Sequence, residues 1–161
     1  MRNLRYLLLP AAAGLLLAVP AAAGASIVPQ RGMLGGKVGM TAAQLQARIG
    51  PPTAVRQRTN EIFGRYEEYR WGEVFVSVFP SNGRIFTFFT RGRSARTASG
   101  VGVGSTETYL RARLRGERCL TEGGFRRCVI GQELPGRIVT SFAISRTTSR
   151  VTSVVVGRVI D

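Results

Sequence analysis

The sequence predicts an α+β fold made of two tandem repeats, each a short helix packed on a three-stranded antiparallel β-meander. Comparing the chain with itself gives the first observation: residues 38–41 align with 103–106, at an offset of about 65 residues. The alignment continues further on, where residues 83–88 match 149–154. The second observation is that each unit combines a helix-start pattern with alternating apolar residues typical of strands.

The first helix is predicted to begin at Thr41 and to end at Gly50. Thr41 and Gln44, three positions later, form the capping-box pattern, in which each side chain bonds the backbone N–H of the other residue. Leu45 and Ile49 lie on one face at i,i+4 spacing. Gly50 and the two prolines after it stop the helix. Because a helix this short is marginal alone, we expect it to be held by packing on a sheet.

The second helix is predicted from the same pattern one repeat later. Ser105 or Thr106 supplies the N-cap, since both hydroxyls can accept a backbone N–H. Leu110 and Leu114 face inward, and Gly116 ends the helix.

Strands are predicted by alternation of apolar residues and by turn residues between them. In the first repeat they cover 62–71, 74–79 and 85–90, and in the second 125–131, 137–145 and 150–160. Phe75, Phe79, Phe86 and Phe88 form a candidate interaction face, because they are too many large aromatic side chains for an ordinary exposed surface. The alternative is that they form core between the repeats.

The first 25 residues have the composition of a secretory signal peptide. Arg2 and Arg5 form a basic start, residues 6–19 are apolar, and small residues suited to cleavage follow. A retained membrane anchor is the alternative interpretation. We therefore expect a secreted or extracytoplasmic protein of the cell envelope, with a first repeat over 26–94 and a second over 95–161.

Cys119 and Cys128 are the two cysteines of the chain, and we expect them to form a disulfide. Gly123 and Gly124 lie between them and let the chain turn back. Export to an oxidising compartment favours the bond. A reactive dithiol is disfavoured, because the spacing is not Cys-x-x-Cys.

Basic residues dominate the charge, with 23 Lys+Arg against 9 Asp+Glu. Such a surface attracts polyanions, and guanidinium groups bind phosphate or carboxylate oxygens in pairs. The candidate anion-binding residues form two clusters: Arg91, Arg93 and Arg96 between the repeats, and Arg111, Arg115 and Arg118 on and after the second helix. Anionic envelope polymers or lipid head groups fit this charge, whereas nucleic acid is disfavoured by export. A purely compositional arginine bias remains an alternative.

Catalytic chemistry is poorly supported by the composition. The chain has no histidine, and its one aspartate is Asp161, so imidazole bases and aspartate-centred metal or phosphoryl-transfer sites are excluded. Residues 100–104 are glycine-rich and precede a helix, but they lack the third glycine and the lysine of nucleotide-binding loops. We therefore predict no catalytic residues, no metal site and no cofactor.

Residues 39–41 (Gly-Met-Thr) open the first helix, and residues 49–53 (Ile-Gly-Pro-Pro-Thr) follow it. This arrangement resembles the G-M-T/S … L-G-x-P signature of the BamE/SmpA/OmlA group, which shares its helix-plus-sheet fold with tandem-repeat β-lactamase inhibitor proteins. The match covers about 15 residues; Ile49 replaces the usual leucine, and the second repeat lacks the methionine and the prolines. The resemblance implies a secreted, non-catalytic envelope or inhibitor-like module, although the lipid-attachment cysteine of outer-membrane assembly lipoproteins is missing.

The function expected from the sequence is therefore a non-enzymatic interaction module of the cell envelope that binds an unidentified envelope or secreted protein. The alternative is a polyanion-binding envelope surface protein that uses the arginine clusters.

Overall fold

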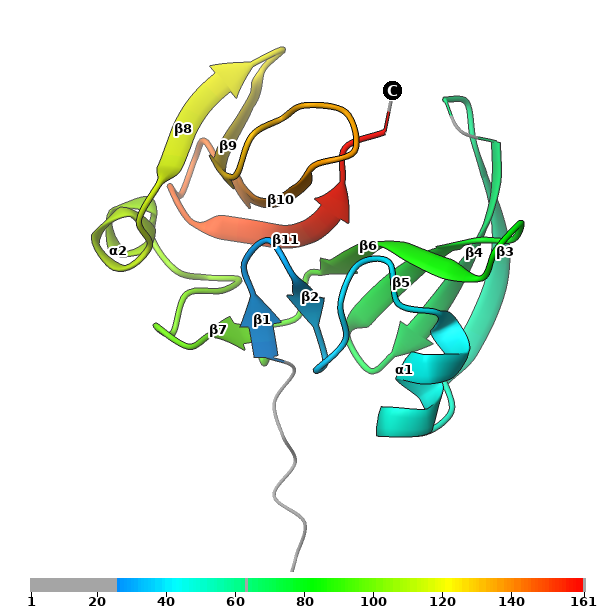
Figure 1. Ribbon diagram of the computed structural model, residues 1–161. Helices are drawn as coiled ribbons and strands as arrows, with labels where there is room; N and C mark the ends of the chain where they lie inside the picture. The colour runs from blue at the N-terminus through cyan, green and yellow to red at the C-terminus, as the bar shows by residue number, and fades with distance from the viewer. Residues whose placement is uncertain (1–25, 63, 161) are drawn as a thin grey trace, which may run out of the picture.

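The computed structural model describes residues 26–62 and 64–160. Its main element is an antiparallel sheet of eight strands in the order β3-β4-β5-β6-β11-β10-β9-β8 (Figure 1). The strands are β3 (Ala54–Asn60), β4 (Gly64–Trp71), β5 (Val74–Phe79), β6 (Arg84–Thr90), β8 (Glu117–Glu122), β9 (Phe125–Ile130), β10 (Ile138–Ile144) and β11 (Val151–Arg158). The sheet is joined at its centre, where β6 pairs with β11.

A smaller three-stranded sheet and two helices accompany the large sheet. The small sheet has the order β2-β1-β7 and consists of β1 (Ser26–Val28), β2 (Gly32–Met33) and β7 (Arg96–Thr97). The helices are α1 (Ala42–Ile49) and α2 (Glu107–Arg113). Among the described residues, no helix has the length and apolar character needed to cross a membrane.

Both helix starts carry the predicted caps. The Thr41 hydroxyl accepts the Gln44 N–H and the Gln44 side chain accepts the Thr41 N–H, each over 3.1 Å, which confirms the capping box. Thr106 caps α2 by accepting the Tyr109 N–H over 3.1 Å. Leu45 and Ile49 were expected to share one face of the helix, but Leu45 is fully buried whereas Ile49 is 39% exposed.

The hydrophobic core lies against one face of the large sheet, here called the core face. This face presents buried side chains such as Val76, Phe88, Phe142, Val154 and Val156. Leu45 from α1, Leu110 from α2 and Met33 from β2 are fully buried in the same cluster. The helices and the small sheet therefore cover a single side of the large sheet, and burial of these side chains is the main force that holds the layers together.

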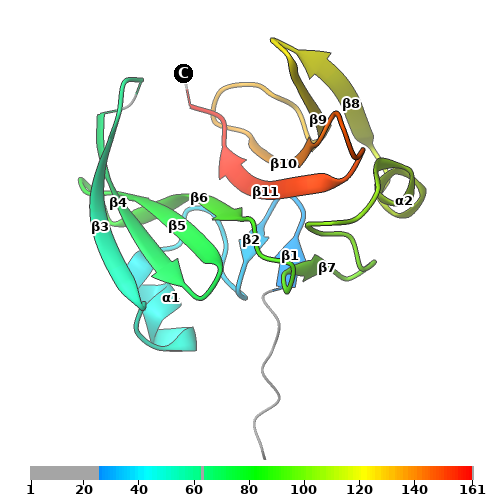
Figure 2. The same ribbon diagram turned by 180° about the vertical axis from the view of Figure 1, so that it is seen from behind.

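The opposite side of the large sheet, here called the concave face, is partly exposed. Figures 1 and 2 show the outer hairpins β3–β4 and β8–β9 rising on opposite sides of the central strands. Phe75, Ser77 and Phe79 alternate with buried valines along β5 and are half-buried on this face. Because a strand shows successive side chains to opposite faces, this alternation separates core from surface within one strand.

The predicted fold class is wrong. The protein is mostly β, and the described residues contain no unit of a helix on a three-stranded meander. Each half of the sheet has a fourth strand that the sequence did not indicate: β3 in one half and β8 in the other. Both faces of β3 are largely exposed to solvent. This edge strand therefore lacks the alternating apolar pattern that marks a strand in sequence.

Two other sequence predictions concern the division of the chain. The predicted signal peptide at residues 1–25 lies outside the described residues. The boundary predicted between residues 94 and 95 falls in the segment that links β6 to β7, and the division into 26–94 and 95–161 stays a prediction.

Candidate functional site

A glycine turn precedes each helix, and each turn is hydrogen-bonded to a strand of the large sheet. The N–H of Gly39 donates to a carbonyl of β6, and that of Gly104 to a carbonyl of β11, over 2.7 Å in both cases. Arg84 donates from Nη1 to the Gly39 carbonyl over 2.8 Å, and Arg150 donates in the same way to Gly104. The backbone φ angles of 88° and 89° at these turns favour glycine.

A cavity of about 440 Å³ lies beside the second glycine turn. Its charged and polar lining side chains are Arg93, Arg96, Ser105, Tyr109 and Arg150. The Ser105 hydroxyl accepts from Arg96 Nη1 over 3.2 Å and from a backbone N–H of the glycine-rich segment over 3.1 Å. Two of the three arginines are thus tied to the cavity wall, each by one of its five N–H donors.

The first glycine turn has its own cavity, of about 640 Å³. Its lining side chains include Lys37, Met40, Gln44, Arg48 and Arg84. Met40 is buried, so the position that corresponds to the hydroxyl of Ser105 in the second turn is apolar here. The two cavities share a backbone frame but differ in the side chains that face them.

The predicted arginine clusters are divided by the structure. Arg93 and Arg96 come together at the second cavity, whereas Arg91 lies over the ring of Phe89 at 5.5 Å from its centroid. In the other cluster, Arg111 pairs with Glu117 and Arg118 with Glu133, each at 3.7 Å, while Arg115 is exposed. The anion-binding role of all six residues stays a prediction.

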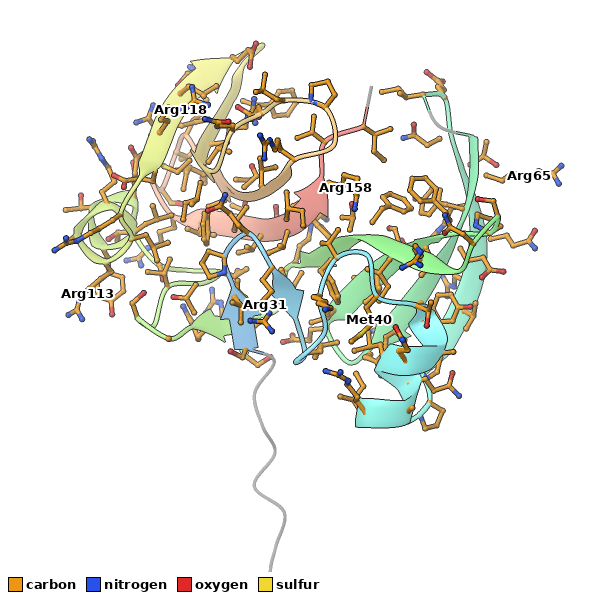
Figure 3. All side chains as sticks on the ribbon, in the orientation of Figure 1. Arg31, Met40, Arg65, Arg113, Arg118 and Arg158 are labelled. Atoms are coloured by element: carbon orange, nitrogen blue, oxygen red, sulfur yellow. A yellow bond between two sulfur atoms is a disulfide. The ribbon has the colours of Figure 1, made fainter. Side chains whose placement is uncertain are left out.

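Most of the positive charge is not neutralised by nearby carboxylates. Between residues 26 and 160 the chain has 21 Lys and Arg residues. Within the described residues, five of them lie within 4.0 Å of a glutamate oxygen: Arg58, Arg111, Arg118, Arg126 and Arg127. Figure 3 shows labelled arginines at widely separated places, including Arg31, Arg65, Arg113 and Arg118.

The predicted interaction face of four phenylalanines is split between the two sides of the sheet. Phe75 and Phe79 are half-buried on the concave face, where Phe79 stacks on Phe86 at 4.2 Å between ring centroids. Phe88 pairs with a valine of the core face and is fully buried. Phe89, opposite Phe75 at 6.1 Å, belongs to the concave face and was missed.

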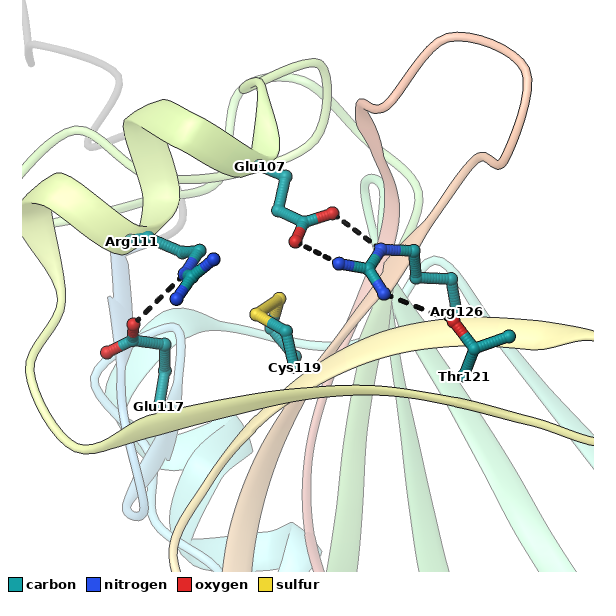
Figure 4. The surroundings of a disulfide bond; sticks show 7 residues. Glu107, Arg111, Glu117, Cys119, Thr121 and Arg126 are labelled. Atoms are coloured by element: carbon teal, nitrogen blue, oxygen red, sulfur yellow. Dashed lines mark hydrogen bonds and ion pairs between the residues drawn. A yellow bond between two sulfur atoms is a disulfide. The ribbon is translucent and has the colours of Figure 1, made fainter.

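The Cys119–Cys128 disulfide is present, as predicted, and joins directly opposite residues of β8 and β9. Figure 4 shows it beneath α2, with Glu107 of that helix directed toward Arg126. Among the described residues, one group has metal-ligand atoms close enough together to hold an ion: Glu107 and the two cysteines. Since both sulfurs are bonded to each other, they are not available as thiolate ligands.

Ion pairs organise the side chains around this disulfide. Arg126 donates to both oxygens of Glu107, with an Nε–Oε2 distance of 2.7 Å. This hydrogen bond lowers the pKa of Glu107 and raises the pKa of Arg126. Hydrogen bonds to Glu133 raise the pKa of Arg127. The carboxylate of Glu107 is therefore used inside the α2–β9 contact and does not reach the cavity at Gly104, whose lining contains no acidic residue.

Several exposed apolar residues were also missed. Ile62, Phe125 and Leu134 are 74%, 78% and 54% exposed. Ile62 and Phe125 are next to the turns of the outer hairpins β3–β4 and β8–β9. The strands predicted over 62–71 and 125–131 include Ile62 and Phe125, but periodicity does not show that an apolar residue at the end of a strand is exposed.

No family model matches the chain, and no curated protein matches it. Among solved structures, it is similar to a cysteine-rich secretory protein from Staphylococcus aureus, with a TM-score of 0.47 and 15% identity over 81% of this chain and 47% of that one. An extracellular protein containing an SCP domain from Bacillus anthracis gives 0.48 and 13%, over 75% and 44%. The uncharacterized protein yfeY from Escherichia coli gives 0.46 and 18%, over 83% and 98%.

The chain thus spans less than half the length of the first two structures. All three TM-scores lie below 0.5, and the function proposed below rests on the residues of this chain. The resemblance to the BamE/SmpA/OmlA group is wrong: no family model matches the chain, and the eight-stranded sheet is not the expected helix-plus-meander repeat.

Proposed function

We propose that this protein is an extracytoplasmic, non-enzymatic binding module that takes a protein partner on its concave face. The observation that carries the proposal is the set of half-buried aromatic rings on that face, Phe75, Phe79 and Phe89. Partly exposed aromatic side chains grouped on one surface are typical of protein interfaces. The disulfide supports a location outside the reducing cytoplasm.

Cations border these rings and add polar specificity to the surface. Arg70 lies 5.5 Å from the centroid of Phe75, and Arg91 lies at the same distance from Phe89. Stacked guanidinium groups keep most of their N–H donors free for a partner. An aromatic centre with a basic rim fits a partner surface that carries acidic side chains around an apolar patch.

Site-specific photocrosslinking in the producing cell tests this function. A photoreactive phenylalanine analogue at Ser77, which lies between Phe75 and Phe79, should give a discrete crosslinked adduct that is lost with Phe89→Ala. The same analogue at Gln46, exposed on α1 across the core, serves as the matched control and should give none. Identical adduct patterns at both positions, or an adduct insensitive to Phe89→Ala, would exclude the concave face.

A second candidate function is binding of an anionic envelope polymer or of lipid head groups by the basic surface. The specific observation in its favour is that, within the part of the chain that the structure describes, five of the 21 cations have a glutamate partner, which leaves a large positive excess there. Retention on heparin or teichoic-acid resin should fall steeply with salt.

The arginine pairs provide the variants for that experiment. Arg111→Ala with Arg115→Ala should lower the eluting salt concentration. Arg48→Ala with Arg65→Ala removes the same charge from the first half of the chain and should have a smaller effect. Equal effects of the two double variants would mean that the whole surface acts by net charge alone.

A further inference from the structure

We infer that the cavity beside Gly104 is a binding site for a doubly charged phosphate group, either inorganic phosphate or the terminal phosphate monoester of a larger molecule. The site is separate from the concave face and does not depend on the protein partner proposed above. It extends the second candidate function, binding of a polyanion, because it gives the basic surface one defined site for a phosphate group.

Three guanidinium groups line this one cavity, and no carboxylate does. Arg93 and Arg96 contribute two of them from the stretch between β6 and the start of β7, and Arg150 contributes the third from directly before β11. Like charges gathered in one hollow repel each other, and a bound anion relieves that repulsion. The Tyr109 hydroxyl on the wall already donates to the carbonyl of Ser99 over 3.3 Å. The guanidinium N–H groups are therefore the donors that match a tetrahedral dianion, which accepts hydrogen bonds on its outer oxygens.

The arginines are positioned before any ligand arrives. Arg150 is fixed by the carbonyl of Gly104 at 2.8 Å and Arg96 by the hydroxyl of Ser105 at 3.2 Å. Each bond uses one N–H, so the remaining donors of both guanidinium groups are free to contact an anion. Fixing the donors in advance lowers the entropy cost of binding.

Glycines keep the cavity wall open. A Cβ atom at Gly102 would clash with the backbone carbonyl oxygen of Ala95 and lie 2.9 Å from Cδ of Arg96, so a side chain there would displace both the backbone and that arginine. A Cβ at Gly100 would lie 3.1 Å from the Tyr109 hydroxyl. The glycine-rich segment 100–104 is thus shaped by close approach of the lining side chains, as well as by its positive φ angles.

Two backbone N–H groups at the start of α2 are already used within the protein. Thr106 accepts the Tyr109 N–H, and the Glu107 N–H donates to the carbonyl of Ser149. Recognition would therefore come from side chains, above all from arginine. This distinguishes the site from loops that hold phosphate with main-chain donors.

Calorimetric titration of the purified protein at constant ionic strength tests the inference. The probes are inorganic phosphate, glycerol 3-phosphate and a glycerol phosphodiester, with chloride as the background ion. We expect saturable binding of the first two and weak binding of the diester, which carries one charge fewer. Binding should also weaken below about pH 6, where the monoester loses its second charge.

Three variants locate the binding. Arg93→Gln should weaken phosphate binding about tenfold, since it removes a charged donor without breaking a hydrogen bond within the protein. Arg96→Gln should weaken it by a similar factor. Arg84→Gln is the matched control, because Arg84 makes the same carbonyl contact at the first glycine turn, and it should leave the affinity unchanged.

The outcomes separate this site from both functions proposed above. Affinity unchanged in Arg93→Gln and Arg96→Gln, or lost equally in Arg84→Gln, would overturn the inference. So would binding of the diester as tight as that of the monoester, which is the result expected for net charge alone. If Arg93→Gln is still retained on the resin, the protein binds polyanions by other parts of its surface than this cavity. Crosslinking at Ser77 tests the concave face and does not depend on either result.

Discussion

The two glycine turns of the molecule have nearly the same backbone and very different surroundings. At Gly39 and at Gly104, an N–H donates to a strand over 2.7 Å and a carbonyl accepts an arginine Nη1 over 2.8 Å. Next to the first turn is a buried methionine, Met40, and next to the second is Ser105, whose hydroxyl holds Arg96. Main-chain bonding therefore fixes the shape of each turn, while a few side chains decide what the turn can bind.

The position of one acidic residue also affects the charge at the second turn. Glu107, in the first turn of α2, is drawn away from the cavity at Gly104 by its ion pair with Arg126. The three arginines of that cavity are consequently left with no carboxylate in the lining. A contact that joins α2 to β9 thus also sets the charge of a site on the other side of the helix start.

The largest expected effects test whether the two halves share one core. Leu45 of α1 and Leu110 of α2 are both fully buried in the same cluster. Leu45→Ala and Leu110→Ala should each lower the free energy of unfolding by about 2–5 kcal/mol, because each leaves a cavity. Urea denaturation followed by circular dichroism measures this.

Both variants should unfold in a single transition, since β6 pairs with β11 across the middle of the sheet. Two separate transitions, one sensitive to each leucine, would instead establish the predicted division into 26–94 and 95–161 as two independent folding units. Val28→Ala, at a surface position that is 40% exposed, is the control and should change the stability little.

Loss of the disulfide, which lies in the second half of the sheet, should have the next largest effect on the stability of the protein. Cys119→Ala with Cys128→Ala removes a crosslink that closes a loop of about ten residues, which corresponds to about 2.7 kcal/mol in the chain-entropy model. Thermal denaturation measures the loss, and mass spectrometry with and without reductant verifies the bond. Addition of reductant to the double variant should cause no further change; a further loss would show that the destabilisation has another origin.

Regular, half-buried elements could be predicted from the sequence, whereas edges could not. In β5, buried valines on the core face alternate with half-buried residues on the concave face, so residues 74–79 were recognised as a strand. In β3, five successive residues are exposed; an edge strand with no buried face leaves no alternation in the sequence. The strands of the small sheet have two or three residues, too few for any period to appear.

The phenylalanines of the predicted interaction face are separated where the backbone changes register. A bulge in β6 inserts Phe86 between the pairs Ser77–Thr87 and Val78–Ile85. Phe86 and Phe88, predicted on one face by their spacing of two, therefore lie on opposite faces. Arg150 was missed for a different reason. It lies directly before β11 and contacts Gly104, 46 residues away in sequence, and such a long-range contact leaves no local pattern in the sequence.

The helix caps should show a smaller contrast between the halves. Thr41 has a reciprocal bond with Gln44, whereas Thr106 makes a single bond to the N–H of Tyr109. Thr41→Ala and Thr106→Ala should each cost about 1 kcal/mol of stability. Gln44→Ala should cost less than Thr41→Ala, because it removes only the returning bond of the capping box. A loss in Gln44→Ala as large as in Thr41→Ala, measured by urea denaturation, would show that Gln44 acts by packing instead.

The smallest expected effect is a pH dependence confined to the second half. The hydrogen bond from Arg126 lowers the pKa of Glu107 in the folded protein, so the folded state binds this proton less readily than the unfolded chain does. The resulting stabilisation is fully present above the unfolded pKa, near 4.3, and is lost as the pH falls through the lower, folded value. Glu107→Gln and Arg126→Gln should both flatten the curve of unfolding free energy against pH in this acidic range. If the two variants kept the wild-type slope there, the contact between α2 and β9 would not be electrostatic, and the explanation for the uncompensated charge at Gly104 would fail with it.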